Sequence, residues 1–347
     1  MWVEPFSLPL ESSLETAKGP ITERRGFLVG VEGKNDDQPA GIGEATPLAG
    51  WTESHEACQD ALAATDPNAP DSPPDPATTP AAAHAVELAE LDARGRRTGT
   101  PLAGGLRAEL GVDTTIPATV PVNATVGDSS VDETVTAAET AIEEGYDCLK
   151  LKVGSRAVDE DIERVRAVRE AIGDAVEIRV DANGAWSESA AETAITAFAD
   201  LDVAYVEQPL ANDALAAHNR LRGQGIDIAL DESLAEVSIE AVIEREAADV
   251  VILKPMALGG PLRAIRAAAT AREAGIEPVV TTTIDGVVAR TAAVHVAAAI
   301  PDVAACGVAT GSLLAGDLAA DPVTISDGGA SVPTGGGLCG NGFDNLP

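Results

Sequence analysis

The sequence predicts an α/β protein in which a parallel (β/α) barrel follows a smaller N-terminal domain. Three observations lead to this fold class. From about residue 117 onward, short apolar runs alternate with helical stretches rich in Ala, Glu and Arg, at a repeat of roughly 25–30 residues that is typical of βα units. Residues 1–115 lack this alternation. Charged residues also recur where several of the apolar runs end.

The first domain is expected to have an α+β structure. The apolar runs Phe27–Val31 and Gly41–Glu44 indicate strands that a polar turn separates. Helical patterns follow at 53–64 and 80–97. The stretch between them, about 66–80, is rich in Pro, Asp and Ala, which favours a flexible surface insertion.

Eight apolar runs are predicted to be the barrel strands, near 118–124, 148–152, 176–181, 203–206, 226–231, 249–253, 277–281 and 303–308. Helical stretches separate them at 131–145, 156–172, 187–200, 212–223, 235–247, 260–274 and 286–300. Eight such units over residues 116–319 predict a closed barrel. A doubly wound open sheet is the alternative, because alternation alone does not show closure. The Gly-rich segment 320–347 loses the pattern and is expected to return to the N-terminal domain.

The chain is strongly acidic, with a net charge of −33 from 56 acidic and 23 basic side chains. This charge repels nucleic acid and anionic membranes, and it would also repel the expected partner, a small-molecule carboxylate, unless salt screened it; a homo-oligomer stays open. Scarce lysine and abundant Ala, Asp, Glu and Thr resemble proteins of salt-accumulating cells. An acidic protein of an ordinary cell is the alternative.

The cysteines and the start of the chain indicate the cytoplasm. Four scattered cysteines show neither CxxC nor disulfide-framework spacing. No apolar run is long enough to cross a membrane. The first residues lack a basic stretch followed by an apolar one, so no secretory leader is expected.

Charged residues end five consecutive predicted strands, at the rim where a (β/α) barrel carries its active site. These residues are Lys150, Lys152, Asp181, Glu207, Asp231, Glu232 and Lys254. The chain has only five lysines. Because arginine serves any purely ionic purpose but does not lose its proton, a retained lysine is expected where an amine has to do so.

The three acids Asp181, Glu207 and Asp231 predict a metal site. They follow adjacent strands and would repel one another unless a cation joined them. Oxygen-only ligands suit a hard ion, so Mg²⁺ is expected, with Mn²⁺ as the alternative. Zinc is excluded because no His or Cys stands with the three acids.

The lysines flank these acids and are expected to face each other across whatever the metal holds. Lys152 and Lys254 form the expected catalytic pair, and Lys150 either supports Lys152 or is an ion-pair partner inside the barrel. Lys150 and Lys152 share one strand face about 7 Å apart. Their repulsion, together with desolvation and a nearby metal, is expected to lower an amine pKa toward about 7–8, the range of a general base. A metal and an opposite ammonium stabilise the charge left when a proton leaves the carbon next to a carboxylate, so this reaction is predicted.

These motifs resemble those of the enolase superfamily, muconate-lactonizing-enzyme subgroup. The matching pieces are Lys150-Leu151-Lys152, Asp181-Ala182-Asn183, Val206-Glu207-Gln208-Pro209, Asp231-Glu232-Ser233, Lys254-Pro255, and residues 24–31 and 41–48 of the first domain. The resemblance implies an enolase-like, (β/α)7β-type TIM barrel with an N-terminal α+β capping domain. It implies Lys152 as base and acid, with Asn183 and Glu232 in support.

Within the subgroup, the sequence resembles the o-succinylbenzoate synthases of menaquinone biosynthesis, in part through the stretch Cys306–Gly311. The resemblance implies a dehydration in which Lys254 stays protonated and stabilises an enediolate. N-acylamino acid racemases, dipeptide epimerases and muconate-type cycloisomerases are the alternatives. Dipeptide epimerases carry Asp-x-Asp after strand 8, whereas this chain has no acid between Ala304 and Ala315.

The same resemblance implies substrate contacts at the rim and in capping-domain loops near 16–24 and 48–54. The candidate residues are Arg24, Trp51, Asn123, Thr283, Gly286 and Thr310. After strand 7, the stretch Thr281–Gly286 departs from the Ser-rich, Glu-containing version common in the family.

A non-catalytic barrel that binds an acidic metabolite is the interpretation from a different class. It predicts the loss of at least one residue among the two catalytic lysines and the three acids of the metal site. None is lost, so the sequence favours an enzyme.

Overall fold

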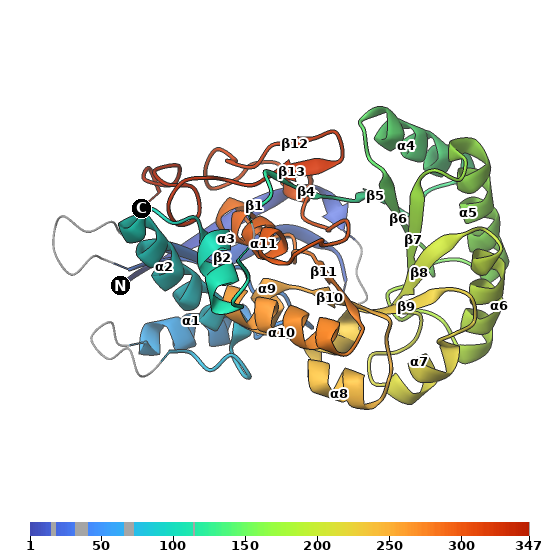
Figure 1. The fold of residues 1–347 in the computed structure, drawn as a ribbon, viewed down its shortest axis with the longest axis horizontal. Helices are drawn as coiled ribbons and strands as arrows, with labels where there is room; N and C mark the ends of the chain where they lie inside the picture. Colours follow the sequence, from blue (N-terminus) through green and yellow to red (C-terminus); the bar gives the residue numbers. More distant parts are fainter. Residues whose placement is uncertain (15–18, 32–40, 66–72, 114, 347) are drawn as a thin grey trace.

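The structure, a computed structural model, describes residues 1–14, 19–31, 41–65, 73–113 and 115–346. Its N-terminal part is an antiparallel sheet of order β1-β2-β3 beside three helices. These elements are β1 (Trp2–Leu14), β2 (Ile21–Val31), β3 (Gly41–Ala45), α1 (His55–Ala64), α2 (Pro80–Thr98) and α3 (Leu102–Glu109). They form one end of the molecule, where both chain ends also lie (Figure 1). The predicted polar turn and residues 66–72 of the predicted insertion fall outside the described residues.

A seven-stranded parallel sheet forms the barrel. Its strands are β5 (Ala124–Val126), β6 (Cys148–Lys152), β7 (Glu177–Asp181), β8 (Val203–Glu207), β9 (Asp227–Leu230), β10 (Val250–Leu253) and β11 (Glu277–Val280). Every strand pairs with its neighbour in the chain. A doubly wound sheet reverses its strand order, so the open-sheet alternative is excluded and the (β/α) fold class is confirmed.

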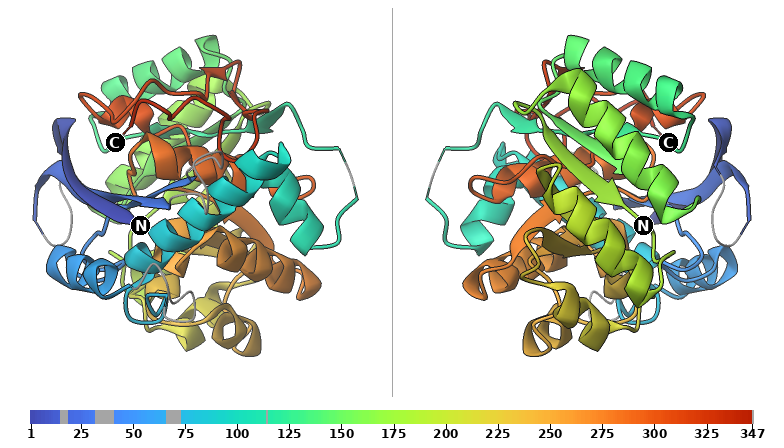
Figure 2. Two further views of the ribbon diagram at one scale, coloured as in Figure 1. Left: turned by 90° about the vertical axis from the view of Figure 1, so that its left-hand side faces the viewer. Right: turned by 90° about the vertical axis from the view of Figure 1, so that its right-hand side faces the viewer.

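Helices cover the outside of this sheet, and α4 to α7 follow one another around one side of it (Figures 1 and 2). They are α4 (Val131–Glu143), α5 (Val158–Ile172), α6 (Glu188–Ala199), α7 (Leu215–Leu221), α8 (Ile239–Glu244), α9 (Pro255–Leu258), α10 (Pro261–Glu273) and α11 (Val287–Ala299). The sequence starts several of them with a serine cap, as at α4, where Ser130 and Glu133 form a capping box. Helix α11 is buried along its whole length because it packs against both β3 and α3. None of the helices in the described ranges is long and apolar enough to span a membrane.

The first and eighth predicted strands differ from expectation. The first divides into β4 (Thr119–Pro121) and β5, and β4 pairs with β13 (Gly329–Ser331), which pairs with β12 (Ile325–Ser326). The eighth, near 303–308, is reduced to the bridges Val122↔Cys306 and Thr281↔Gly307, which join the two edges of the sheet. Glycine allows this close approach, since a Cβ on Gly307 would lie 2.5 Å from Thr281 Oγ1.

The C-terminal segment runs back along the first domain. The Leu102 amide donates to the Gly337 carbonyl at 2.7 Å, and the Leu338 amide donates to Asp92 Oδ1 at 2.8 Å. The expected domain boundaries, at 115/116 and 319/320, stay predictions.

Candidate active site

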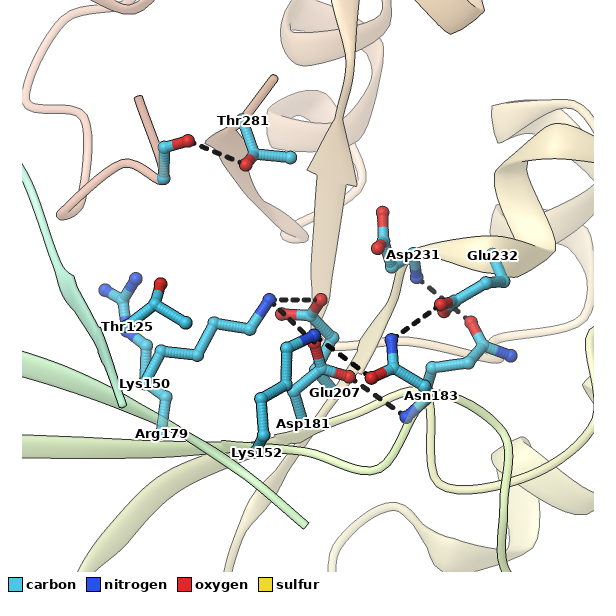
Figure 3. A network of polar contacts seen from close by, with 12 residues as sticks. Thr125, Lys150, Lys152, Arg179, Asp181, Asn183, Glu207, Asp231, Glu232 and Thr281 are labelled. Carbon is cyan, nitrogen blue, oxygen red and sulfur yellow. Dashed lines mark hydrogen bonds and ion pairs between the residues drawn. The ribbon is translucent and has the colours of Figure 1, made fainter. Parts of the chain in front are cut away.

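Charged side chains gather at the carboxyl ends of β6 to β9 (Figure 3), and Lys254 follows the end of β10. Strand register places Lys152 beside Asp181, and Asp181 beside Glu207. Because side chains alternate along a strand, Lys150 and Lys152 share the inner face. Beneath them the barrel is mainly apolar, with a buried cluster that includes Tyr205, Ala229 and Ile252. The guanidinium of Arg179 is also buried there, 4.9 Å from the centroid of the Tyr205 ring, so the interior beneath the rim holds a cation as well as apolar side chains.

Each rim lysine contacts a rim carboxylate. Lys150 Nζ lies 2.9 Å from Asp181 Oδ2 and 2.6 Å from Glu207 Oε1. Lys152 Nζ donates to Asp181 Oδ2 at 2.6 Å, and Lys254 Nζ donates to Asp231 Oδ2 at 2.6 Å. The side chain of Lys152 is 35% exposed, whereas that of Lys254 is 10% exposed. Lys152 is thus the more open of the two expected catalytic lysines.

Lys150 forms a buried ion-pair network with Asp181 and Glu207. Burial lowers the pKa of Lys150, but the charges of Asp181 and Glu207 outweigh burial, and the pKa lies well above its usual value. Burial likewise raises the pKa of Asp181, but Lys150 and Lys152 outweigh it and hold that pKa well below its usual value. The expectation that repulsion between the two lysines lowers an amine pKa is therefore wrong for Lys150, which is an ion-pair partner.

Burial disfavours the ionised form of the other two acids, and this is the form that a bound cation would stabilise. Burial, then the charge of Asp181, raises the pKa of Glu207, and burial raises the pKa of Asp231 despite Lys254. Glu207 Oε2 and Asp231 Oδ1 are buried without a hydrogen-bond partner. An unpaired buried carboxylate oxygen is costly.

These free oxygens fit a hard divalent cation. Among the described residues, no three His, Cys, Asp or Glu side chains are grouped so that they could hold a metal ion as they stand. Each of the three acids of the rim instead contacts a lysine ammonium through one of its oxygens. The free oxygens remain for a metal, and oxygen-only donors suit Mg²⁺.

Trp51 is the candidate substrate residue that lies nearest to the rim charges. Lys254 Nζ lies 3.1 Å from the centroid of the Trp51 ring. The ammonium is therefore held between an aromatic face and the Asp231 carboxylate, an arrangement that attracts a cation from both sides. The capping-domain loop that carries Trp51 thus contacts the barrel site directly.

Arg24 joins the capping domain to the barrel. Its buried guanidinium donates to the backbone carbonyls of Ile284, Pro47 and Thr46, at 3.1, 3.3 and 2.7 Å. These contacts fix the start of the loop that leads to Trp51, so they give Arg24 a structural role. A substrate contact stays a prediction for this residue.

Glu44 and Asp285 complete this junction, which we call the interdomain clamp (Arg24, Glu44, Asp285). Glu44 accepts hydrogen bonds from the amides of Gly286 at 2.7 Å and Ala289 at 3.0 Å, at the start of α11. Asp285 accepts from the amide and hydroxyl of Thr283. Two predicted substrate residues, Thr283 and Gly286, therefore bond to protein acids.

Asn123 and Thr310 lie where the barrel closes. Asn123 is buried and its Nδ2 donates to Thr125 Oγ1 at 3.3 Å. The hydroxyl of Thr310 shares a hydrogen bond with that of Thr282 at 2.8 Å. Their proposed contacts with substrate are likewise predictions.

Gln208 is a site residue that the sequence analysis did not single out. Its Oε1 accepts from the amides of Asp231 at 3.0 Å and Ser233 at 3.2 Å, and its Nε2 donates to Leu210 O and Ser233 Oγ. It thereby fixes the end of β9 relative to the end of β8. The signal available in the sequence is an amide directly after a buried strand end.

The fold and the rim together define a barrel enzyme whose site lies under a capping domain. The family described as enolase C-terminal domain-like matches residues 133–341. The chain therefore belongs to this family, and it is an enzyme of the enolase superfamily.

Individual relatives differ in their reactions. The o-succinylbenzoate synthase of Thermobifida fusca is 40% identical over 192 residues, which cover 54% of this chain and 59% of the relative. The N-succinyl-L-Arg/Lys racemase of Bacillus cereus is 37% identical over 163 residues, 46% of this chain and 44% of the relative. The matched stretch thus spans about half the length of these relatives.

A solved structure matches almost the whole chain. The dipeptide epimerase from Enterococcus faecalis V583, complexed with Mg and the dipeptide L-Leu-L-Tyr, superimposes with a TM-score of 0.83 at 26% identity. The match covers 97% of each chain. The capping domain and the barrel therefore share one arrangement with this relative.

Proposed function

We propose that this chain is an o-succinylbenzoate synthase, a lyase that removes water from 2-succinyl-6-hydroxy-2,4-cyclohexadiene-1-carboxylate to give 2-succinylbenzoate in menaquinone biosynthesis. The unequal setting of its two catalytic lysines carries the proposal. Lys152 is partly open, whereas Lys254 is held between a carboxylate and the Trp51 ring. A dehydration on one face needs one amine that exchanges a proton and one fixed cation. The 40% identical synthase supports the same reaction.

The rim residues account for each step. Asp181, Glu207 and Asp231 would hold Mg²⁺, which when bound stabilises negative charge on the substrate carboxylate. Lys152 accepts the proton from C1 of the ring, and the electron pair of that C–H bond moves toward the carboxylate. The Lys254 ammonium stabilises the developing charge.

Water then leaves from the neighbouring carbon. The electron pair forms a C1–C6 double bond while the C6–O bond breaks. Lys152 returns its proton to the departing hydroxyl, so the proton and the hydroxyl leave together as water and Lys152 is again a free amine. One lysine thus serves as base and acid, and the product ring is aromatic.

An N-succinyl amino acid racemase is the second candidate, favoured by the 37% identical racemase. That reaction would require Lys254 to release its proton to the opposite face of the substrate. A dipeptide epimerase is less favoured because no acid follows the barrel closure up to Ala315, and the next acid, Asp317, bonds to Arg290 at 2.8 Å. A muconate-type cycloisomerase is the remaining alternative, supported by a chloromuconate cycloisomerase that is 34% identical over 192 residues.

The test is direct turnover. Purified protein is incubated with the cyclohexadiene substrate and Mg²⁺ in molar KCl, and 2-succinylbenzoate is measured by chromatography. Product should form in the presence of Mg²⁺. Its formation should stop when EDTA removes the metal and should resume when excess Mg²⁺ is added. Absence of product, together with racemisation of N-succinyl-L-arginine, would replace the synthase by the racemase. We also infer a cytoplasmic enzyme that works at high salt.

A further inference from the structure

Lys152 has two fixed acceptors for its three N–H bonds. Its Nζ donates to Asp181 Oδ2 at 2.6 Å and to Asn183 Oδ1 at 3.0 Å. The N–H bonds of an ammonium point to three corners of a tetrahedron. Two fixed acceptors therefore set the direction of the third position, which faces the substrate. This position holds the lone pair of the free amine before proton transfer and an N–H bond after it.

Asn183 is itself held in one orientation. Its Nδ2 donates to Glu232 Oε1 at 2.8 Å, while its backbone amide donates to Asp181 Oδ1 at 3.0 Å (Figure 3). Because the oxygen and nitrogen of an amide point in different directions, the bond to Glu232 turns the oxygen toward Lys152. The backbone supports this placement with a φ of +44°, in the left-handed region that asparagine tolerates better than most residues.

We propose that Asn183, oriented by Glu232, is a positioning residue that directs the proton-accepting lone pair of Lys152 at the substrate carbon. This inference rests on the part of the proposed function in which Lys152 transfers the proton, whichever product forms. Lys254 has a different setting, since the contacts that the structure describes for its ammonium are Asp231 and the Trp51 ring. The hydrogen bonds that connect Glu232, Asn183 and Lys152 thus lie on the Lys152 side of the site, and Lys254 has no counterpart to them among the described contacts.

The variants separate orientation from charge and from folding. Asn183→Gly removes the amide without strain, because glycine accepts a positive φ. Glu232→Gln keeps an oxygen that accepts from Asn183 and removes the charge, whereas Glu232→Ala removes the acceptor. An exposed pair of the same type, Asn212 Nδ2 to Glu236 Oε1 at 3.0 Å, supplies the matched controls Asn212→Ala and Glu236→Ala.

Kinetics give the first readout. Asn183→Gly should lower kcat about 100-fold, with KM within about twofold, because misplacing a reacting group by about 1 Å has an effect of this size. Glu232→Ala should lower kcat about 10-fold, Glu232→Gln should lose clearly less than Glu232→Ala, and both controls should stay near the parent value. With substrate deuterated at C1, the isotope effect on kcat should rise in Asn183→Gly, because proton transfer becomes limiting. An unchanged isotope effect, or equal losses in Glu232→Gln and Glu232→Ala, would overturn the proposal.

Two further readouts test the role of Asn183 whether the enzyme is a synthase or a racemase. If the cyclohexadiene compound is not turned over, exchange of the α-proton of N-succinyl-L-arginine in ²H₂O replaces product formation. Crystal structures need no activity: Lys152 Nζ should shift in Asn183→Gly and stay in place in Glu232→Gln. An unmoved Nζ in Asn183→Gly overturns the proposal whatever the reaction. A drop in Mg²⁺ affinity that parallels the loss of activity would also overturn it, in favour of a role in metal binding.

Discussion

Lys152 and Lys254 carry the same functional group in two different settings. Lys152 contacts Asp181 and Asn183 and is partly exposed, whereas Lys254 lies between Asp231 and the Trp51 ring. Cation–π contacts and ion pairs both favour a charged amine. At the residue scale, the structure therefore suits one lysine that exchanges a proton and one that stays a cation.

Substitution of the two lysines should reflect this difference. Lys152→Ala and Lys254→Ala should each lower kcat by about 10³-fold or more, since general base catalysis and charge stabilisation each contribute on this scale. Lys254→Arg should recover part of the dehydration because it restores a cation, whereas Lys152→Arg should recover none because arginine does not release its proton. Product formation is measured at saturating substrate, with circular dichroism as the folding control. Near-full activity in Lys254→Ala would contradict the charge model.

The rim residues could be predicted from sequence because each charge follows an apolar run in a chain that uses little lysine. Their partners could not. Contacts such as Gln208 to Asp231 or Trp51 to Lys254 join residues that are distant in the chain. No local pattern encodes them, since they depend on how strand ends and loops meet.

At the scale of elements, the interdomain clamp joins the capping loop to the barrel. Glu44 on β3 bonds to the first amides of α11, and Arg24 on β2 bonds to the loop before α11 and to the loop after β3. A carboxylate at a helix N-terminus is favourable, but burial and the nearby Asp285 raise the pKa of Glu44 to about 7. The junction therefore contains an acid that titrates near neutral pH.

This raised pKa gives a prediction for stability. The folded protein binds the Glu44 proton more tightly than the unfolded chain, so protonation of Glu44 stabilises the fold. This stabilisation is fully present below the unfolded pKa of 4.5 and is lost as the pH rises through about 7. Its size is on the order of 3 kcal/mol, because each pKa unit is worth about 1.4 kcal/mol. In urea unfolding, the advantage of the parent over Glu44→Gln, which does not titrate, should shrink between about pH 5 and pH 8. A difference that grew with pH would contradict it.

Most elements could be predicted from periodicity, since the predicted barrel helices match α4, α5, α6, α10 and α11 closely, whereas α7 and α8 are shorter than predicted. The exceptions have tertiary causes. The eighth run pairs only through bridges because it crosses between β5 and β11, and Gly307 brings the backbones close there. Likewise β4 leaves the barrel to pair with β13, more than 200 residues away, and the sequence of β4 alone does not reveal that partner.

On the scale of the whole molecule, the acidic surface sets the conditions under which the fold is stable. Excess negative charge destabilises a compact state through self-repulsion. Exposed pairs such as Arg220 with Glu188, at 2.8 Å, offset little of this, since such pairs contribute about 1 kcal/mol or less. Salt weakens both effects, but the repulsion is the larger one because acids outnumber bases 56 to 23.

The free energy of unfolding should therefore rise with KCl. The Debye length falls from about 10 Å at 0.1 M to about 3 Å at 1 M, so repulsion between neighbouring acids becomes short-ranged. Urea midpoints should increase from 0.1 to 2 M KCl. A variant with glutamine at six exposed glutamates (Glu139, Glu143, Glu170, Glu192, Glu240 and Glu273) should be more stable at 0.1 M and respond less to salt. Sucrose controls for general solvent effects, since it stabilises without screening. If the parent and the variant gained equally from KCl, charge screening would not be the cause, because the variant carries six fewer of the charges that salt must screen.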